Sequence, residues 1–383
     1  MEFFMKIAFI HNDEVSKYSY GSDHPFVAAR SSMTLDMCRE RELFGPNTEH
    51  ITPYPASRDD VARFHDDDYL DMLRNAEEGD VSPLWLEYGL GQPECPVFRG
   101  MWDYSLLVAG GSLEAARLVG GGGFQRAFHP AGGLHHAHRR LAGGFCYIND
   151  VVLAVMELKL RGLRVAVVDL DGHHGDGTQV AFYEDPGVLT VSIHESGKTL
   201  FPWGGWAEER GKGPGEGYNI NIPLPERAYD EIFLQAVREV VVPALVQYRP
   251  DVLITEVGAD ILAVDPLTNL CMTNNAVADS LEMLDELELP WIVVGGGGYN
   301  VEATVKAWTL GWSVISRKPL QDSFAGLIGG MMTGLSDVQE GDLRDRIRYV
   351  TPEIREAVEE ETFPILEDWK QMLSRGMFGS GST

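Results

Sequence analysis

The chain has 383 residues, of which 44% are hydrophobic and 23% charged, a composition typical of a globular protein and not of a disordered or fibrous one. Its 31 basic and 58 acidic residues give a net charge of −27, and no Lys/Arg cluster stands out, so direct DNA or RNA binding is not expected. An acidic surface either favours cationic partners, such as Lys-rich peptides or polyamines, or only maintains solubility.

Targeting and redox signals point to the cytoplasm. No apolar run approaches the roughly 18 residues of a membrane span, and the first residues lack the features of a signal peptide. The four cysteines are widely spaced and form no CxxC pair, which argues against a disulfide scaffold and a structural zinc site. We therefore expect a cytoplasmic protein without a membrane partner.

In the first third of the chain, the pattern predicts a strand at residues 6–10. Helices are predicted at residues 28–43, 59–79 and 101–119. Arg30 lies near the start of the first long helix and has no obvious partner, so we expect a solvated helix residue. Residues 88–96 are glycine-rich and aperiodic, which indicates a surface loop. Residues 127–149 are also dense in loop-forming residues.

Beyond residue 149 the pattern alternates between helices and short apolar strands. Strands are predicted at 163–168, 188–193, 218–222, 251–256 and 291–294, and helices at 149–161, 230–248, 275–287 and 301–316. Unbroken β-branched runs are typical of strands buried on both faces of a parallel sheet, and the alternation predicts a parallel α/β sheet with right-handed crossovers. No linker divides the chain, so we expect one domain over residues 1–375, with a helical addition at 320–375 and a flexible tail at 376–383.

The segment Asp169–Gly177, with the sequence Asp-Leu-Asp-Gly-His-His-Gly-Asp-Gly, follows directly after a predicted buried strand. Open α/β sheets place their ligand sites beyond the carboxyl ends of strands. Because alternate residues of an extended segment share a direction, Asp171 and His173 can face one pocket. Such a density of carboxylates and imidazoles rarely serves packing alone and predicts a metal or catalytic site.

Three further loops carry unusual polar content, at His135-His136, Gly258–Asp260 and Gly295–Tyr299. Asp260 follows the predicted strand 251–256, and Asp171 follows the predicted strand 163–168. If these two strands are neighbours, both carboxylates and His173 converge. Two carboxylates and one imidazole leave a coordination position open, which is the arrangement of a catalytic zinc site. Taken alone, Asp260 is more often a turn or helix-cap residue.

Together these motifs resemble the histone deacetylase family, which includes acetoin-utilisation-type proteins and acetylpolyamine amidohydrolases. The resemblance covers about residues 6–316 and is carried by Gly132–His136, Gly144–Asn149, Asp169–Gly177, Gly258–Asp260 and Gly295–Tyr299. It implies the arginase/deacetylase α/β fold, a single domain around an eight-stranded parallel sheet with its active site at the carboxyl ends of the strands.

The resemblance also implies a role for each polar residue of these motifs. The implied zinc ligands are Asp171, His173 and Asp260, and iron(II) suits the same ligands. The implied active-site histidines, each with its carboxylate partner, are His135 with Asp169 and His136 with Asp176. Of the two histidines, we expect His136 to transfer the proton. Tyr299 is implied as the hydrogen-bond donor to the transition state.

Two monovalent cation sites for K⁺ or Na⁺ follow from the resemblance alone. The implied ligands, mostly through main-chain oxygens, are Asp169, Asp171, His173, Ser192 and Ile193 for the first site and Phe182, Asp185, Val188 and Tyr218 for the second.

A narrow apolar slot for the substrate is also implied, lined by Gly144, Phe145, Phe201 and Leu267. Two aromatic rings suit the methylene stem of a lysine. Glu94 takes the approximate place of a rim aspartate that anchors substrate in class I relatives, and because it is one methylene longer, peptide anchoring stays open.

We therefore expect a zinc-dependent amidohydrolase that removes acetyl or another short acyl group from lysine in proteins or peptides. Hydrolysis of an acetylpolyamine or another small cationic amide is the alternative. A silent acyl-lysine-binding module is disfavoured by the intact Tyr299, and an arginase-like enzyme because the sequence shows ligands for one metal only. The preferred acyl group, the native metal and the oligomeric state stay open.

Overall fold

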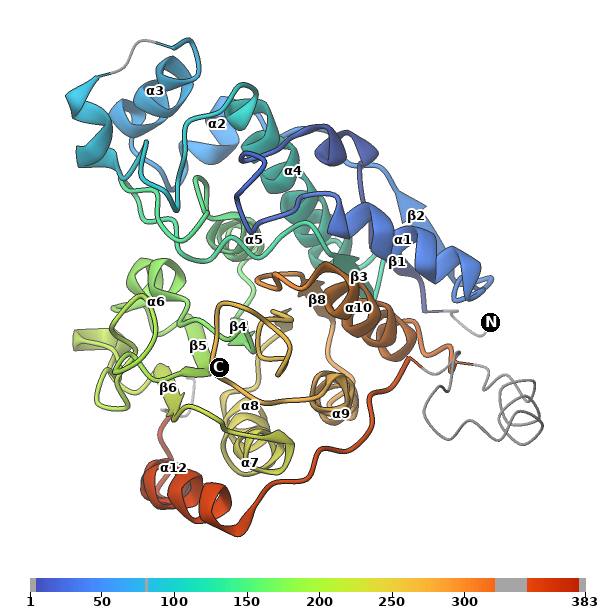
Figure 1. Ribbon diagram of the computed structural model, residues 1–383, viewed down its shortest axis with the longest axis vertical. Coiled ribbons are helices and arrows are strands. Elements are labelled where there is room, and N and C mark those ends of the chain that lie inside the picture. The colour runs from blue at the N-terminus through green and yellow to red at the C-terminus, as the bar shows by residue number, and fades with distance from the viewer. Residues whose placement is uncertain (1–4, 80–81, 321–342, 379–383) are drawn as a thin grey trace.

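Eight parallel strands form one continuous sheet, in the order β2-β1-β3-β8-β7-β4-β5-β6 (Figure 1). The structure is a computed structural model that describes residues 5–79, 82–320 and 343–378. The strands are β1 (Ile7–Ile10), β2 (Thr48–Ile51), β3 (Arg126–His129), β4 (Val165–Asp169), β5 (Val188–Glu195), β6 (Asn219–Leu224), β7 (Val252–Glu256) and β8 (Trp291–Val294). The predicted eight-stranded parallel sheet is confirmed.

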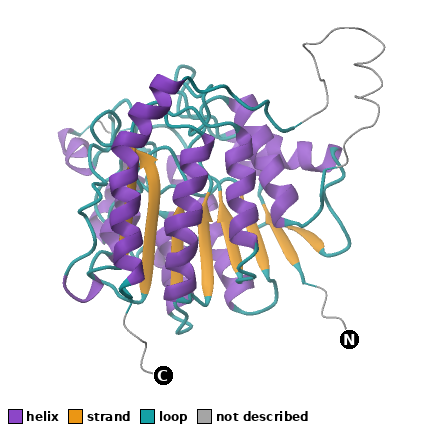
Figure 2. Ribbon diagram, turned by 90° about the horizontal axis from the view of Figure 1, so that it is seen from below, coloured by secondary structure: helices purple, strands orange, loops and turns teal. Residues whose placement is uncertain are grey.

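Helices cover both faces of this sheet (Figure 2). The α-helices of the described residues are α1 (Arg30–Glu40), α2 (Arg58–Val61), α3 (Asp67–Ala76), α4 (Met101–Gly120), α5 (Asp150–Lys159), α6 (Asp176–Phe182), α7 (Asp230–Ala236), α8 (Val242–Tyr248), α9 (Asn274–Asp285), α10 (Val301–Ile315) and α12 (Pro352–Ser374). A π-helical turn, Val237–Val241, joins α7 to α8, and three short 3₁₀ helices lie in loops of the part of the chain that the structure describes. Within the described ranges, no helix combines the length and apolarity needed to cross a membrane.

Each strand of the sheet centre contributes to two separate hydrophobic cores. In β4, Val165 and Val167 pack with α4 and α5, whereas Ala166 and Val168 pack with the helices of the opposite face, among them α7 to α10. Successive side chains of a strand point to opposite faces. The unbroken apolar sequence of this strand is therefore explained by burial on both sides.

Two strands of four residues each were not predicted. β3 (Arg126–His129) lies partly in the segment that we expected to be loop, and β2 (Thr48–Ile51) was not recognised. In β3 the apolar pair is flanked by polar residues that the fold nevertheless buries. Arg126 pairs with Asp285, and the His129 ring lies 3.1 Å from two main-chain oxygens. These partners are distant in sequence, so strand propensity alone cannot reveal the strand.

The C-terminal helix α12 packs against β6 and the α7–α8 segment. Its Trp369 is fully buried, and the indole Nε1–H donates to the Asn221 carbonyl at 3.0 Å. Of the described residues in the helical addition expected over 320–375, Pro352 to Ser374 are helical and 343–351 are not. Residues 321–342 and residues 379–383 of the expected tail lie outside the described residues.

Candidate metal and catalytic site

The polar loops identified in the sequence follow β3, β8, β7 and β4, which are neighbours at the centre of the sheet. The loops after these strands therefore meet at one edge, although they come from distant parts of the chain. The site begins where β4 and β7 end, and in their parallel register Asp169 pairs with Glu256.

Three side chains form the candidate metal centre, Asp171, His173 and Asp260. Their ligand atoms all lie within 4.8 Å of one another, and all three residues are buried. Nδ1 of His173 lies 2.7 Å from Asp260 Oδ2 and 3.4 Å from Asp171 Oδ1. Two carboxylates and one imidazole suit zinc or iron(II), and buried carboxylates are favourable when they coordinate a cation. The donor set therefore fits a divalent metal ion.

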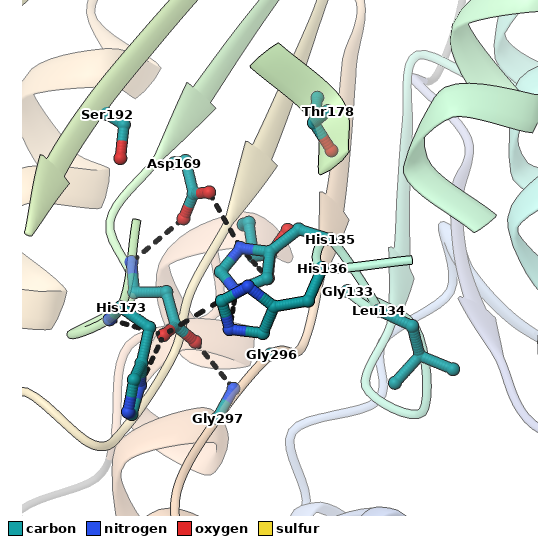
Figure 3. A network of polar contacts seen from close by, with 12 residues as sticks. Gly133, Leu134, His135, His136, Asp169, His173, Thr178, Ser192, Gly296 and Gly297 are labelled. Atoms are coloured by element: carbon teal, nitrogen blue, oxygen red, sulfur yellow. Dashed lines mark hydrogen bonds and ion pairs between the residues drawn. The ribbon is translucent and has the colours of Figure 1, made fainter. Parts of the chain in front are cut away.

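Backbone groups hold these ligands in place (Figure 3). The Gly297 N–H donates to Asp171 Oδ2 at 2.6 Å, and the Gly172 N–H donates to Asp260 Oδ1 at 2.8 Å. A Cβ at Gly297 would lie 2.1 Å from Asp260 Oδ2. Glycine at this position is therefore needed for the loop after β8 to approach the metal ligands.

The two histidines of the loop after β3 lie side by side, and Asp169 lies next to His135 (Figure 3). Nδ1 of His135 lies 2.8 Å from Asp169 Oδ2, and Nδ1 of His136 lies 2.8 Å from Asp176 Oδ1. The two Nε2 atoms are 3.1 Å apart. A carboxylate at Nδ1 fixes the tautomer and the orientation of a histidine ring, so that Nε2 is the nitrogen that faces the reaction.

The two histidines have opposite electrostatic settings. Burial alone would lower the pKa of His135, but the carboxylates of Glu256 and Asp169 outweigh it and raise that pKa well above its ordinary value. Burial and the charge of His135 lower the pKa of His136 to about 4. His135 therefore binds its proton more tightly than His136, and His136 is the ring that is neutral at pH 7 and can act as a base.

Glu256 is a site residue that the sequence did not reveal. It is fully buried at the end of β7, and its Oε1 lies 2.9 Å from Nδ1 of His135. Together with Asp169 and His135 it forms a second group of metal-binding residue types, where the sequence had shown ligands for one metal only. The sequence held only a weak sign of this role, because Glu256 is a single acidic residue at the end of an apolar strand.

Two residues at the start of α5 hold the histidine loop. Asn149 was noted in the sequence only as the end of a motif, and Asp150 was not recognised. Asn149 Nδ2 donates to the carbonyls of His135 and Ala137 at 3.0 and 3.1 Å. The Asp150 carboxylate accepts the N–H groups of residues 133 and 134 at 3.1 and 2.7 Å. Both residues are fully buried, so these hydrogen bonds lie in the interior of the protein.

Tyr299 comes from the loop after β8, and its ring centroid lies 6.3 Å from that of His173. Burial, with the nearby charges of Asp260 and Asp171, raises the pKa of Tyr299 well above its ordinary value. The phenol therefore keeps its proton and can donate a hydrogen bond toward the metal centre.

The expectation that Arg30 is a solvated helix residue is wrong. Its side chain is buried, and its guanidinium donates to the carbonyls of Gly296 and Gly298 in the loop that carries Tyr299. It is stacked against Phe26 and Trp308, with its Cζ 4.5 and 4.9 Å from their ring centroids. The partners are main-chain carbonyls far along the chain, which is why no charged partner was visible in the sequence.

The residues expected to line the substrate slot border this centre. The Phe201 ring lies 5.0 Å from that of His136, and the Phe145 ring lies 5.4 Å from that of Tyr299. Both phenylalanines are half-buried. Gly144, with φ +50°, brings its backbone directly against the His136 ring.

The remaining expected substrate-binding residues are Leu267 of the slot and Glu94 of the rim. Leu267 is half-buried, and its N–H donates to Asp265 Oδ1 at 2.9 Å. Glu94 is exposed, in a loop beside His24, whose ring lies 4.6 Å from that of Phe145.

The two expected monovalent cation sites differ in their surroundings. At the first, Asp169 and Ser192 are register partners at the ends of β4 and β5, beside the segment that carries Asp171 and His173 and next to Ile193. At the second, backbone N–H groups already bond to the carbonyls of Phe182, Asp185 and Tyr218. The second site also includes Val188 at the start of β5, and the Asp185 carboxylate pairs with Lys159.

Comparisons with known proteins agree with this geometry. The model of the histone deacetylase domain matches residues 24–315. The acetoin utilization protein AcuC of Bacillus subtilis is 38% identical over 312 residues, covering 79% of this chain and 80% of that protein. Histone deacetylase clr6 of Schizosaccharomyces pombe is 34% identical over 323 residues, covering 83% and 78% of the two chains.

Solved structures of bacterial-type relatives share the whole architecture. A histone deacetylase homolog from Aquifex aeolicus superimposes with a TM-score of 0.81 at 31% identity, covering 95% of this chain and 100% of that chain. A homolog complexed with SAHA gives a TM-score of 0.83 at 32% identity with the same coverage. The matched domain, the sequence relatives and the arginase/deacetylase fold lead to one conclusion, that this chain belongs to the histone deacetylase family.

Proposed function

We propose that the protein is a zinc-dependent amidohydrolase that removes acetyl or another short acyl group from the Nε of lysine in proteins or peptides. The observation that carries this proposal is the convergence, in one buried site, of a three-ligand metal centre with two carboxylate-bound histidines. Membership of the deacetylase family supports a hydrolase.

Zinc would be held by Asp171, His173 and Asp260, and when bound it would polarise the acyl carbonyl and lower the pKa of a water molecule. Around it, the residues of the chain move the proton. Nδ1 of His136 is engaged by Asp176, so Nε2, which faces Nε2 of His135 at 3.1 Å, is the nitrogen that would accept the proton of the attacking water and give it to the leaving amine. The low pKa of His136 keeps it neutral and ready to act at pH 7.

His135 and Tyr299 would stabilise the negative charge that develops on the acyl oxygen. His135 is held between Asp169 and Glu256, which favour its protonated form beside the reacting centre. Tyr299 keeps its proton and donates a hydrogen bond. Donors that are fixed in advance and directed at a developing oxyanion typically contribute about 2.7–4 kcal/mol each to catalysis.

The aromatic walls at Phe145 and Phe201 suit the apolar stem of an acyl-lysine, with Gly144 and Leu267 completing the slot. That a similar structure was solved with SAHA supports ligand binding by this fold. An acetylpolyamine is the second candidate substrate, because the chain has a net charge of −27 and Glu94 is exposed beside the aromatic wall.

We also infer a structural K⁺ or Na⁺ ion at the first cation site, which the pairing of Asp169 with Ser192 supports, and a second ion on resemblance alone. A single domain through residue 375 is supported by the two cores that share one sheet. Four free cysteines support a reducing, cytoplasmic environment.

The test is a side-by-side measurement of amine release by the zinc-loaded protein. The substrates are Nε-acetyl- and Nε-propionyl-lysine peptides, N-acetylputrescine and N-acetylspermidine. We expect kcat/KM to be highest for an acyl-lysine peptide and to fall by about 10²–10³-fold in Tyr299→Phe. Faster turnover of the polyamines would favour the second candidate, and no release from any substrate would reject the proposal.

A further inference from the structure

Asp265 is a buried carboxylate that bridges two loops of the site. It lies in the loop after β7, and only 9% of its surface is exposed. Its Oδ2 accepts the Tyr299 N–H at 2.7 Å and the Asn300 N–H at 3.4 Å. Its Oδ1 accepts the Leu267 N–H at 2.9 Å. One side chain therefore contacts both the loop of the candidate oxyanion donor and a residue of the substrate slot.

The contact to Tyr299 is the shortest of these. Hydrogen bonds from N–H groups to ionised carboxylates are shorter and roughly twice as strong as neutral ones, and 2.7 Å is at the short end of their range. Asn300 caps α10, so the carboxylate also lies just before the N-terminus of a 15-residue helix, where negative charge is favoured. Asp265 is thus well placed to fix the backbone from which the Tyr299 side chain extends.

The loop that carries Tyr299 needs such a fixed point. Gly296 and Gly298 have φ values of +125° and +131°, in a run of four glycines whose backbone has wide intrinsic freedom. Arg30 holds the carbonyls of these two glycines, whereas Asp265 holds the N–H of Tyr299 itself. The loop is therefore held by the guanidinium of Arg30 at its carbonyls and by the carboxylate of Asp265 at its N–H groups.

We propose that Asp265 is a positioning residue for Tyr299, and that it couples the placement of the Tyr299 hydroxyl to the Leu267 wall of the substrate slot. This inference rests on the proposed function, in which Tyr299 donates to the developing oxyanion. Asp265 itself does not touch the reacting atoms. It acts through the backbone of Tyr299, and displacement of about 1 Å of such a group is enough to lower catalysis by about 100-fold.

The kinetic test is a double-mutant cycle between Asp265→Asn and Tyr299→Phe. Asparagine keeps the size of the side chain but removes its charge and one acceptor oxygen. We expect Asp265→Asn to lower kcat by about 10- to 100-fold with KM within about 3-fold of the parent. In the Tyr299→Phe background the same substitution should lower kcat by less than about 3-fold, because the group it positions is already gone.

Asp230→Asn is the matched control, because Asp230 also accepts a backbone N–H, that of Thr273 at 2.7 Å, but lies outside the site. It should leave kcat near that of the parent. Zinc content and the midpoint of urea unfolding are measured for every variant. Equal losses from Asp265→Asn in the presence and absence of the Tyr299 hydroxyl would show a general structural role and overturn the inference.

A second measurement does not depend on activity. Hydrogen exchange of the zinc-loaded protein should become faster in Asp265→Asn at the amides of Tyr299, Asn300 and Leu267, with the β4 amides unchanged. If the parent hydrolyses no acyl-lysine substrate, the proposed function fails while the exchange result still decides whether Asp265 fixes this loop. Unchanged exchange at Tyr299 would overturn the inference by itself.

Discussion

Gly144→Ala places one methyl group against the histidine that we propose as the general base. A Cβ at Gly144 would lie 2.2 Å from Cδ2 of His136 and 2.7 Å from its Cγ. Carbon atoms in good contact are about 3.5–4.0 Å apart, so the ring has to move by more than about 1 Å. Because Asp176 holds Nδ1 of His136 at 2.8 Å, this movement also disturbs the contact that orients the ring.

The size of the effect follows from two terms. Displacement of a reacting group by about 1 Å lowers catalysis by about 100-fold, so we expect kcat to fall by that factor or more. Gly144 has φ +50°, and a left-handed conformation costs a non-glycine residue roughly 1–2 kcal/mol. The free energy of unfolding should fall by at least this amount.

The adjacent glycine provides the control. A Cβ at Gly143 would have the His136 carbonyl oxygen as its nearest neighbour, at 3.8 Å, which is ordinary contact. Gly143→Ala should therefore keep kcat and stability close to those of the parent. The assay compares kcat and KM on one acetyl-lysine peptide, with urea unfolding and zinc content measured for both variants. Gly144→Ala with more than half of the parent kcat, or an equal loss in Gly143→Ala, would refute this reasoning.

Three further predictions concern stability and metal binding. Arg30→Met leaves two buried carbonyls without their donor and should lower the free energy of unfolding by about 2–4 kcal/mol in urea; an unchanged urea midpoint would contradict the assigned contacts. Burial lowers the pKa of His65 to about 3, and burial together with His129 lowers that of His11 to about 4. As the pH falls through 6.5, these two histidines take up protons in the unfolded chain but not in the folded protein. The stability that they contribute is present above pH 6.5, and the two together should lower the free energy of unfolding by about 4 kcal/mol between pH 7 and pH 5; equal urea midpoints at the two pH values would argue against it. Zinc at about 100 times its Kd should stabilise the apoprotein by about 2.7 kcal/mol in a thermal melt, and Asp260→Asn should remove most of this shift; a full shift in that variant would exclude Asp260 as a ligand.

Local sequence pattern was sufficient for the parts of the fold that depend on neighbouring residues. The β-branched runs of β4 and β7 indicated strands buried on both faces, and the structure places their alternate residues in two separate cores. The short strands β2 and β3 were missed because polar residues interrupt their apolar pattern, and the partners that make this tolerable are distant in the chain.

For the candidate site, the order of residues after each predicted strand was enough to name the candidate ligands Asp171, His173 and Asp260. Which other groups reach these ligands depends on how the strands are arranged in the fold. The carboxylates of Glu256 and Asp265 and the guanidinium of Arg30 join the site through the order of strands and through bonds to main-chain atoms. Main-chain N–H and C=O groups are the same at every residue, so a sequence cannot show which of them a buried charge will contact.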